Sequence, residues 1–426
     1  MNVILMLVLL TLMTLRVPVA FAMALVASIT LLWTGVPLSL IPSRLFGSLN
    51  TFSLLAIPLF IFVGEVMNVA GVTERIFKFA RAFVGHKVGS LGHVNVISSI
   101  IFSGMSGSAV ADAYGLGLIE IKVMKENGWD PAFSAAVTAS SSCIGPIIPP
   151  SIPLVIYAFV AEQSVGRLFL GGLIPGLIMG IALMGLVYVI SKRRHYPVEE
   201  RYNFRQKLKA TILALPSLVT PLLLLSGIGF GIVTPTEGAV VAGIYGLLIG
   251  FLIHHELDFK KLYHALYRTT INSATVLIII ACASTLAWVI TTSGFPEIVK
   301  NNVILISGGN PYIFLFLVNI ILLILGCFIE GTAIIMIMLS ILLPTLIAMD
   351  INLIHFGVVM VLNVMIGIIT PPFGLSLFIV SDIADISFER TVKATFPFII
   401  PLIIVLLLIT YIPGLVTFLP NLVYGG

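Results

Sequence analysis

Long apolar runs, separated by short polar stretches, occupy most of the chain and recur in the same order in its two halves. In the first half the runs cover residues 3–15, 17–34, 51–70, 91–119, 133–160 and 168–190. A basic linker at 192–209 follows, and further runs cover 212–227, 238–253, 271–290, 312–347, 356–381 and 396–411. About 20 apolar residues form a helix that crosses a bilayer. The pattern therefore predicts an all-α protein with many membrane spans.

The runs are interrupted at matching places in the two halves. Residues 144–150 read IGPIIPP and residues 366–372 read IGIITPP, so five of seven positions are identical at a spacing of 222. Proline has no backbone N–H and clashes with the preceding helical turn, so each Pro-Pro pair predicts a broken helix. Paired breaks in two halves of a membrane chain point to the binding site of a secondary transporter.

The run before each broken helix also contains a reversal signal. In the first half, residues 103–108 read SGMSGS, a glycine-serine segment that allows the chain to turn back within the membrane. We expect re-entrant hairpins at about 91–126 and 312–348, which enter and leave the membrane on one side. Each half then has five crossings and one hairpin, and because five is odd, the second half is inverted relative to the first.

This model divides the chain into a first inverted repeat with the linker, 1–211, and a second inverted repeat, 212–426. The two hairpins and the broken helices at about 132–161 and 355–382 would together form a transport domain. The run at 3–15 has neither a basic leader nor a small-residue cleavage site, so we expect a retained span there.

Composition and charge agree with the inverted model. Hydrophobic residues make up 59% of the chain and charged residues 9%, with a mean hydropathy of +1.17, whereas a soluble domain carries about 25% charged residues. If the linker is cytoplasmic, 19 of the 22 Lys and Arg residues share its face, and only Arg44, Arg167 and Lys300 lie opposite. Positive charge favours the cytoplasmic side, so both termini are expected outside. The three cysteines lack metal-site spacing, and nothing suggests nucleic acid or ATP hydrolysis.

Helix breaks inside a membrane leave main-chain carbonyl oxygens free to bind a cation. We expect one sodium ion between the first hairpin tip and the first break, and a second at the equivalent place in the other half. The predicted ligands are Ser103, Ser106, Gly145, Ile148 and Pro149 for the first site, and Gly326, Glu330, Gly367, Thr370 and Phe373 for the second.

The half-helices at the breaks also point their positive N-terminal ends at the same cavity, which favours an anionic substrate. Ser106, Ser108 and Ser151 are the candidate substrate contacts, although Ser140, Ser141 and Ser142 could serve instead. Asp112 could hold the first hairpin in place. For Glu237, which follows Thr234-Pro235, capping of a helix N-terminus is favoured over a binding role.

Two other function classes fit parts of the sequence. Gly104-Met105-Ser106-Gly107 matches the G-x-S-G loop of rhomboid-type intramembrane serine proteases, but a nucleophilic serine needs a nearby histidine, and only His93 lies inside an apolar run. A channel is the other alternative. It differs from a carrier in that it would conduct without a sodium gradient.

Several of these segments resemble one family. Residues 231–239 (GIVTPTEGA) are similar to the G-x-x-T-P-T-E-x-A signature of the large membrane subunit, DctM type, of tripartite ATP-independent periplasmic (TRAP) transporters, with Gly238 where many members have alanine. Residues 103–112 (SGMSGSAVAD) and the two breaks resemble the same family in the same order, so the likeness covers essentially the whole chain.

The resemblance implies an elevator-type carrier of the ion-transporter superfamily, which uses two or more sodium ions to import an organic acid across the bacterial inner membrane. It further implies two partners, a small four-helix membrane subunit, here expected as a separate polypeptide, and a periplasmic substrate-binding protein. Sialic acid, a C4-dicarboxylate or a similar carboxylate would be the substrate. A sodium/carboxylate carrier that works without a binding protein is the nearest alternative.

Overall fold

Every element of the computed structural model is a helix within the part of the chain that it describes, residues 8, 9, 11, 12, 15 and 17–425. Seven of these helical segments are long and apolar enough to cross a membrane. The predicted all-helical membrane fold is therefore confirmed. The predicted span at 3–15 lies mostly outside the described residues.

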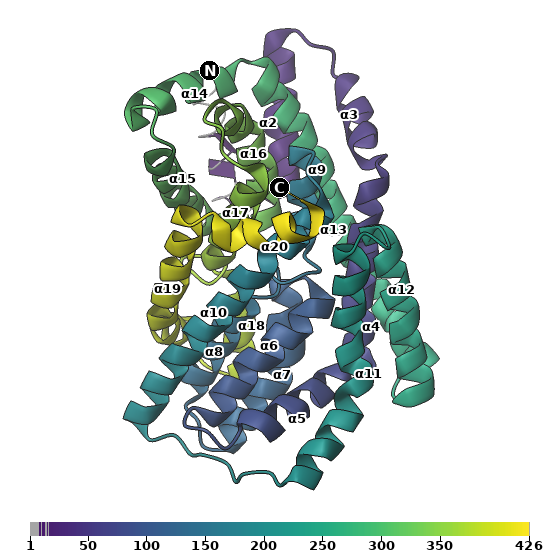
Figure 1. Ribbon diagram of the computed structural model, residues 1–426. Coiled ribbons are helices and arrows are strands. Elements are labelled where there is room, and N and C mark those ends of the chain that lie inside the picture. The colour runs from purple at the N-terminus through teal and green to yellow at the C-terminus, as the bar shows by residue number, and fades with distance from the viewer. Residues whose placement is uncertain (1–7, 10, 13–14, 16, 426) are drawn as a thin grey trace.

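The first half contains the predicted hairpin and broken helix in chain order (Figure 1). Its helices are α2 (Val19–Thr34), α3 (Leu40–Leu49), η1 (Phe52–Leu55), α4 (Ala56–Val69), α5 (Val72–Val84), α6 (Ser90–Ser106), α7 (Ala109–Glu126), α8 (Pro131–Ser142), α9 (Ile152–Ala161) and α10 (Val165–Arg194). The pair α6 and α7 falls in the range predicted for the first hairpin, and α8 and α9 are the two parts of the first broken helix.

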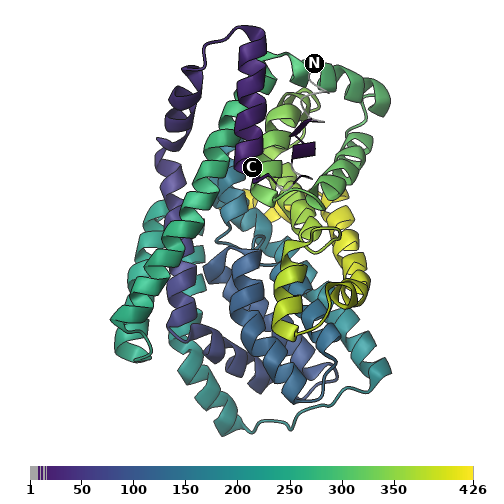
Figure 2. The same cartoon turned by 180° about the vertical axis from the view of Figure 1, so that it is seen from behind.

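The second half follows the same order. Its helices are α11 (Phe204–Gly229), α12 (Pro235–Leu248), η2 (Ile249–Ile253), α13 (Phe259–Thr292), α14 (Phe295–Ser307), α15 (Pro311–Gly326), α16 (Gly331–Ala348), α17 (Leu353–Gly367), α18 (Leu375–Ala384), α19 (Phe388–Tyr411) and α20 (Gly414–Tyr424). Figure 2 shows α13 as a long green helix across the back of the molecule, and it packs against α2 and α4.

Several helix boundaries differ from the prediction. These helices extend beyond their apolar runs, and α11 and α13 begin at a polar capping residue that lies before the run. The side chain of Asn203 accepts a hydrogen bond from the Gln206 amide at 2.9 Å, so α11 begins at Phe204 and not at 212. Asp258 caps α13 in the same way, 2.7 Å from the Lys261 amide. With α10 extending to Arg194, the linker shrinks to residues 195–203.

Four helices were not predicted at all: α3, α5, α14 and α20. The helix α5 is amphipathic and buries Val72, Ile76, Phe77 and Ala80 on one face, so it has no long apolar run to reveal it. The helix α14 meets α15 at an angle of 118°.

Capping was the favoured role for Glu237, and the structure confirms it. Its carboxylate accepts a hydrogen bond from the Thr234 amide at 2.8 Å, and its own amide donates to the Thr234 hydroxyl at 3.3 Å. This reciprocal arrangement is a capping box at the start of α12.

The two halves are interlocked at their broken helices. From the first half α9 packs against α16, and from the second half α18 packs against α7 and α8. At the centre, the thiol of Cys143 lies 3.2 Å from the carbonyl oxygen of Met365, the residue 222 positions later. The spacing is the one at which the IGPIIPP and IGIITPP segments repeat.

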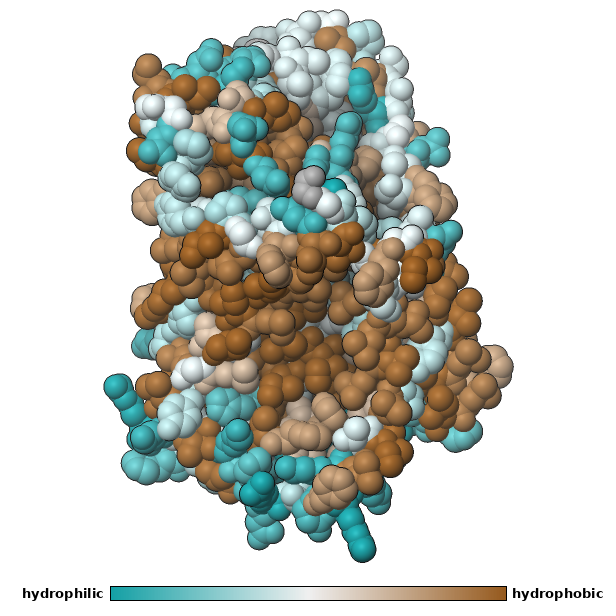
Figure 3. Space-filling model, in the orientation of Figure 1, coloured by the Kyte–Doolittle hydropathy of each residue, from teal (hydrophilic) through white to brown (hydrophobic). Residues whose placement is uncertain are grey.

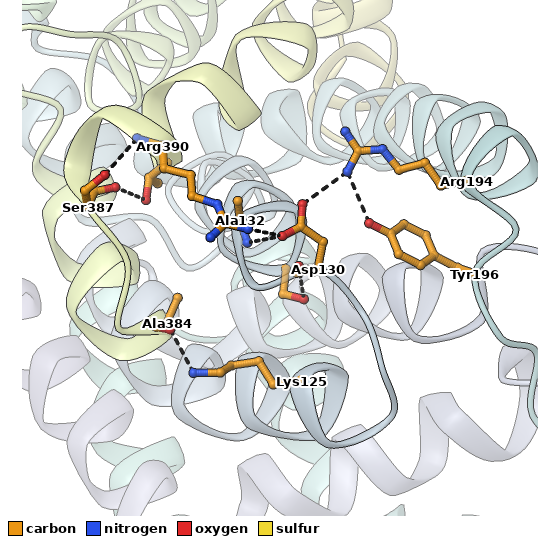
Figure 4. A network of polar contacts seen from close by, with 10 residues as sticks. Lys125, Asp130, Ala132, Arg194, Tyr196, Ala384, Ser387 and Arg390 are labelled. Atoms are coloured by element: carbon orange, nitrogen blue, oxygen red, sulfur yellow. Dashed lines mark hydrogen bonds and ion pairs between the residues drawn. The ribbon is translucent and has the colours of Figure 1, made fainter.

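A group of charged side chains connects α7 and α8 with α10, α18 and α19 (Figure 4). The carboxylate of Asp130, just before α8, accepts from Arg390 of α19 at 2.8 Å and from Arg194 of α10 at 3.2 Å. Nearby, the Lys125 ammonium at the end of α7 donates to the Ala384 carbonyl of α18 at 2.8 Å. These contacts connect helices of both halves.

The surface agrees with a membrane location. On the face shown in Figure 3, an apolar band lies between hydrophilic side chains at the upper and lower ends. Large apolar side chains that are exposed on the described chain include Leu177, Ile181, Leu222 and Ile400. A bilayer would cover such a surface.

Candidate functional site

The first hairpin reverses at Gly107 and touches the first broken helix there. Gly107 has φ +61°, a left-handed conformation that favours glycine. Its carbonyl oxygen accepts a hydrogen bond from the Ile152 amide at 3.3 Å, and a Cβ at Gly107 would lie 2.6 Å from the Pro150 carbonyl oxygen. The sequence-predicted hairpin tip and Pro-Pro break are thus in direct backbone contact.

Asp112 lies one turn into α7 and connects the hairpin tip to the break. Its side chain is 1% exposed, and its Oδ1 accepts a hydrogen bond from the Ser106 hydroxyl. Its Oδ2 has no hydrogen-bond partner among the described residues, and a Cβ placed on Gly145 would lie 2.4 Å from that atom. A buried carboxylate oxygen without a partner is costly, so this oxygen is a free ligand directed at the backbone of Gly145.

The first break supplies further oxygen atoms. Residues 143–151, which include Ile148 and Pro149, are all buried. Within the described residues, no hydrogen bond is made to the carbonyls of Gly145, Ile148 or Pro149. Ser103, one turn before the tip, donates to the Ser99 carbonyl at 2.5 Å, which leaves lone pairs on its own oxygen. The structure therefore joins Ser106, Asp112 and Gly145, whereas the contacts of Ser103 stay within α6.

The three serines proposed as substrate contacts have different surroundings. Ser151 is fully engaged, because its hydroxyl donates to the Pro146 carbonyl and accepts from the Leu154 amide at 3.1 Å. Ser106 donates to Asp112. Ser108 accepts from the Ala111 amide at 3.4 Å, is half-buried, and keeps its hydroxyl hydrogen available. Both Ser108 and Ser151 are N-caps, so the positive ends of α7 and α9 meet at the tip.

The second hairpin tip also touches its break. A Cβ on Gly367 would lie 2.6 Å from the Cα atom of Gly326, so these two backbones meet where no side chain fits. The Phe373 amide donates to the Cys327 carbonyl at 3.3 Å, and the Thr370 hydroxyl donates to the Ile366 carbonyl at 2.8 Å. Gly326, Gly367 and Phe373 are therefore brought together at the tip, as are Gly107 and Pro150 in the first half.

Glu330 is occupied locally in this structure. One of its carboxylate oxygens accepts from the Thr332 hydroxyl at 2.9 Å and the other from the Ala333 amide at 3.3 Å. These bonds cap the start of α16. Its role as a cation ligand remains a prediction.

The two breaks differ in exposure. The first is entirely buried, whereas in the second Pro372 is exposed and Phe373 has a 43% exposed side chain. The ring of Phe373 meets that of Phe328 at the hairpin tip, with centroids 6.3 Å apart. The second tip and break thus open to the surface of the chain.

Sequence reasoning missed a pair of equivalent polar contacts behind the two tips. The Ser141 hydroxyl donates to the side-chain oxygen of Asn95 at 2.8 Å. In the second half, the side-chain amide of Asn363 donates to the side-chain oxygen of Asn319 at 2.9 Å. All four side chains are buried. Aligning the hairpins on Gly107 and Gly331, at a spacing of 224, would have matched Asn95 with Asn319.

The surroundings of Ser106 do not suit a protease. Its hydroxyl is bonded to an acid, Asp112, while Nε2 of His93 is 2.9 Å from the Val88 carbonyl oxygen. The described residues hold no cluster of three His, Cys, Asp or Glu side chains that could bind a metal ion. A cation at either tip would instead have carbonyl and hydroxyl oxygens as ligands, joined in the first half by Asp112, a donor set that suits a hard monovalent ion.

Comparison with known proteins identifies a family. Residues 6–415 match the family model described as tripartite ATP-independent periplasmic transporter, DctM component. The sialic acid TRAP transporter large permease protein SiaM of Vibrio cholerae is 41% identical over 409 residues, which cover 96% of both chains. The C4-dicarboxylate TRAP transporter large permease protein DctM of Pseudomonas aeruginosa is 36% identical and covers 89% of this chain and 88% of its own.

A solved structure shares the fold. The YdaH transporter of Alcanivorax borkumensis has a TM-score of 0.64 and 14% sequence identity, with 88% of this chain and 89% of that chain covered. At that identity the likeness concerns the fold alone. The family match and the two relatives show that this multi-span membrane protein belongs to the DctM family, the large permease component of the TRAP transporters.

Proposed function

We propose that the chain is the large transmembrane subunit of a sodium-coupled secondary transporter that imports an organic acid across the bacterial inner membrane. A small four-helix membrane subunit and a periplasmic substrate-binding protein would complete the system. Relatives named for sialic acid and for C4-dicarboxylates support a carboxylate substrate. In the proposed orientation, the 195–203 linker is cytoplasmic and both termini are periplasmic.

The observation that carries the sodium proposal is the free Oδ2 atom of Asp112, held beside Gly145 in a fully buried break. A sodium ion there would take this oxygen together with carbonyls of the break. The second ion would lie between Gly326 and Gly367, near the Thr370 hydroxyl. Bound cations at both tips would then raise the affinity for an anion placed between the N-termini of α7 and α9.

We propose that the hairpins and broken helices move as one rigid transport domain against the remaining helices. The mutual packing of α9 with α16 and of α18 with α7 supports a single body. Any sodium charge in excess of the substrate charge would couple transport to the membrane potential, at about 2.3 kcal/mol per charge per 100 mV.

The test is uptake into proteoliposomes that contain the chain with its co-purified small subunit, a candidate binding protein and an inward sodium gradient. Saturable uptake of a labelled carboxylate that requires both sodium and the binding protein is expected. Uptake without the binding protein would favour the simpler sodium/carboxylate carrier. Flux that neither saturates nor needs the gradient would indicate a channel and overturn the proposal.

A further inference from the structure

A cationic patch lies where the linker crosses from α10 to α11. The linker is fastened to the ends of α5 and α6: the Glu199 amide donates to the Gly85 carbonyl at 3.2 Å, and the Ser90 hydroxyl donates to the Pro197 carbonyl at 3.1 Å. Glu199 is also paired with Arg81 at 2.6 Å. The Glu199 carboxylate therefore forms its ion pair with Arg81 and with none of the neighbouring cations.

Three cations lie next to the contacts that fasten the linker, because Lys87 follows His86, Arg201 lies two residues after Glu199, and Lys207 lies over Phe83. Lys87, Arg201 and Lys207 come from three different segments, and none has a carboxylate partner in the part of the chain that the structure describes. Lys207 lies over the ring of Phe83, with its Nζ 5.6 Å from the ring centroid. The Nδ1 atom of His86 is buried without a hydrogen-bond partner among the described residues.

The electrostatic effect of the patch is visible on the histidine. Burial lowers the pKa of His86, and the positive charges of Lys207, Arg201 and Lys87 lower it further. The patch thus concentrates three positive charges that form no ion pair with any described residue.

An apolar stripe begins at the same place. Phe204, Leu208 and Ile212 follow one another at spacings of four along α11 and are 80%, 49% and 59% exposed. In Figures 1 and 3 the linker crosses the lower end of the molecule, where hydrophilic side chains border the apolar band. Phosphate would suit the cations, and the adjoining stripe selects a phosphate that carries acyl chains.

We propose that this patch binds the headgroup of an anionic phospholipid, with Lys87, Arg201 and Lys207 around the phosphate and the acyl chains along Phe204, Leu208 and Ile212. Clusters of Lys and Arg at the cytoplasmic end of a membrane helix attract anionic lipids in this way. The bound lipid would hold the linker and the start of α11 at the membrane surface.

The experiment is native mass spectrometry of the purified full-length chain titrated with phosphatidylglycerol, and separately with phosphatidylcholine or inorganic phosphate. The triple variant K87A/R201A/K207A should bind phosphatidylglycerol at least about tenfold more weakly than the unmodified chain, because each cation near the surface contributes to affinity. The matched control K122A/K260A/K393A removes the same charge from exposed, unpaired lysines elsewhere and should change the affinity by less than about twofold.

Three results would overturn the proposal: equal losses in the two triple variants, equal binding of phosphatidylcholine, or full displacement of the lipid by inorganic phosphate. The last would indicate a site for free anions instead. A second measurement uses His86. A bound phosphate offsets the three cations and raises the pKa of His86, so by linkage phosphatidylglycerol should bind more tightly as the pH falls from 8 to 5.5. In His86→Gln that dependence should disappear, and its persistence would contradict the assigned position.

Discussion

The side-chain amide of Asn363 donates a hydrogen bond to the side-chain oxygen of Asn319, 2.9 Å away, in the buried contact between α17 and α15. Ser141 and Asn95 make the equivalent contact between α8 and α6 at 2.8 Å. Each hairpin is therefore fixed by buried side-chain hydrogen bonds to the broken helix that faces its tip, and Asn95 also donates to the Thr138 hydroxyl at 2.7 Å. This shared geometry places the two tips against their breaks.

Replacement of Asn319 by leucine removes its side-chain hydrogen bonds to Asn363 and to the Thr410 hydroxyl, each 2.9 Å long. It should lower the free energy of unfolding by about 1–2 kcal/mol, the value for two hydrogen bonds between membrane helices. The loss stays small because Asn363 also donates to the backbone carbonyl of Asn319 at 3.0 Å, which the variant retains. Thermal unfolding in detergent measures the change. The control Asn302→Leu, at an exposed position, should cost less than about 0.5 kcal/mol; equal costs would show that the buried contact contributes nothing specific.

Gly367→Ala should impair sodium-dependent uptake severely. The added Cβ would lie 2.6 Å from the Cα atom and 2.8 Å from the carbonyl oxygen of Gly326, so the second tip and break must separate. We expect the sodium concentration for half-maximal uptake to rise at least about tenfold, a loss of about 1.4 kcal/mol in binding. Gly185→Ala on α10, where no atom lies within 4 Å, is the control and should behave like the unmodified protein. Normal sodium dependence in Gly367→Ala would exclude a cation site at this contact.

Asp112→Asn tests the first site, because it keeps the shape of the side chain and removes its charge. If Oδ2 binds sodium, half-maximal uptake should require about tenfold more sodium or higher, since a carboxylate attracts a cation far more strongly than an amide does. Ser106→Ala leaves the charge in place and should have a smaller effect. Asp382→Asn, an exposed acid on α18, serves as the matched control. Sodium titrations of initial uptake rates distinguish these cases, and the same half-saturation in Asp112→Asn and Asp382→Asn would remove Asp112 from the site.

Asp130→Asn should have only a modest effect despite its two arginine partners. The guanidinium groups of Arg194 and Arg390 are more than half exposed, and exposed ion pairs contribute about 0.2–1 kcal/mol each. We expect a fall of the unfolding midpoint by a few degrees at most, with uptake largely retained. A complete loss of uptake in a folded variant would show that this network takes part in the transport cycle.

The helix breaks were predictable from the sequence because their causes are local. Gly107 adopts a positive φ that glycine tolerates, and the two Pro-Pro pairs fall in the non-helical segments between α8 and α9 and between α17 and α18. The contact between Asp112 and Gly145 was not predictable, since it depends on how α7 approaches a segment 33 positions later. The amphipathic helix α5 was missed because half of its surface is polar. The first turns of α11 and α13 were missed because charged residues separate their apolar residues, so that no continuous apolar run marks them.

The 222-residue separation between Cys143 and Met365 has a consequence for biosynthesis. At about 5–20 residues per second, the ribosome needs roughly 10–45 s to synthesise the chain between them. During that time α9 has left the ribosome while α16, its packing partner, does not yet exist. The nascent first half must wait in the bilayer while the side of α9 that later meets α16, and the sides of α7 and α8 that later meet α18, are uncovered. Lipid or an insertase is then the temporary occupant of those surfaces.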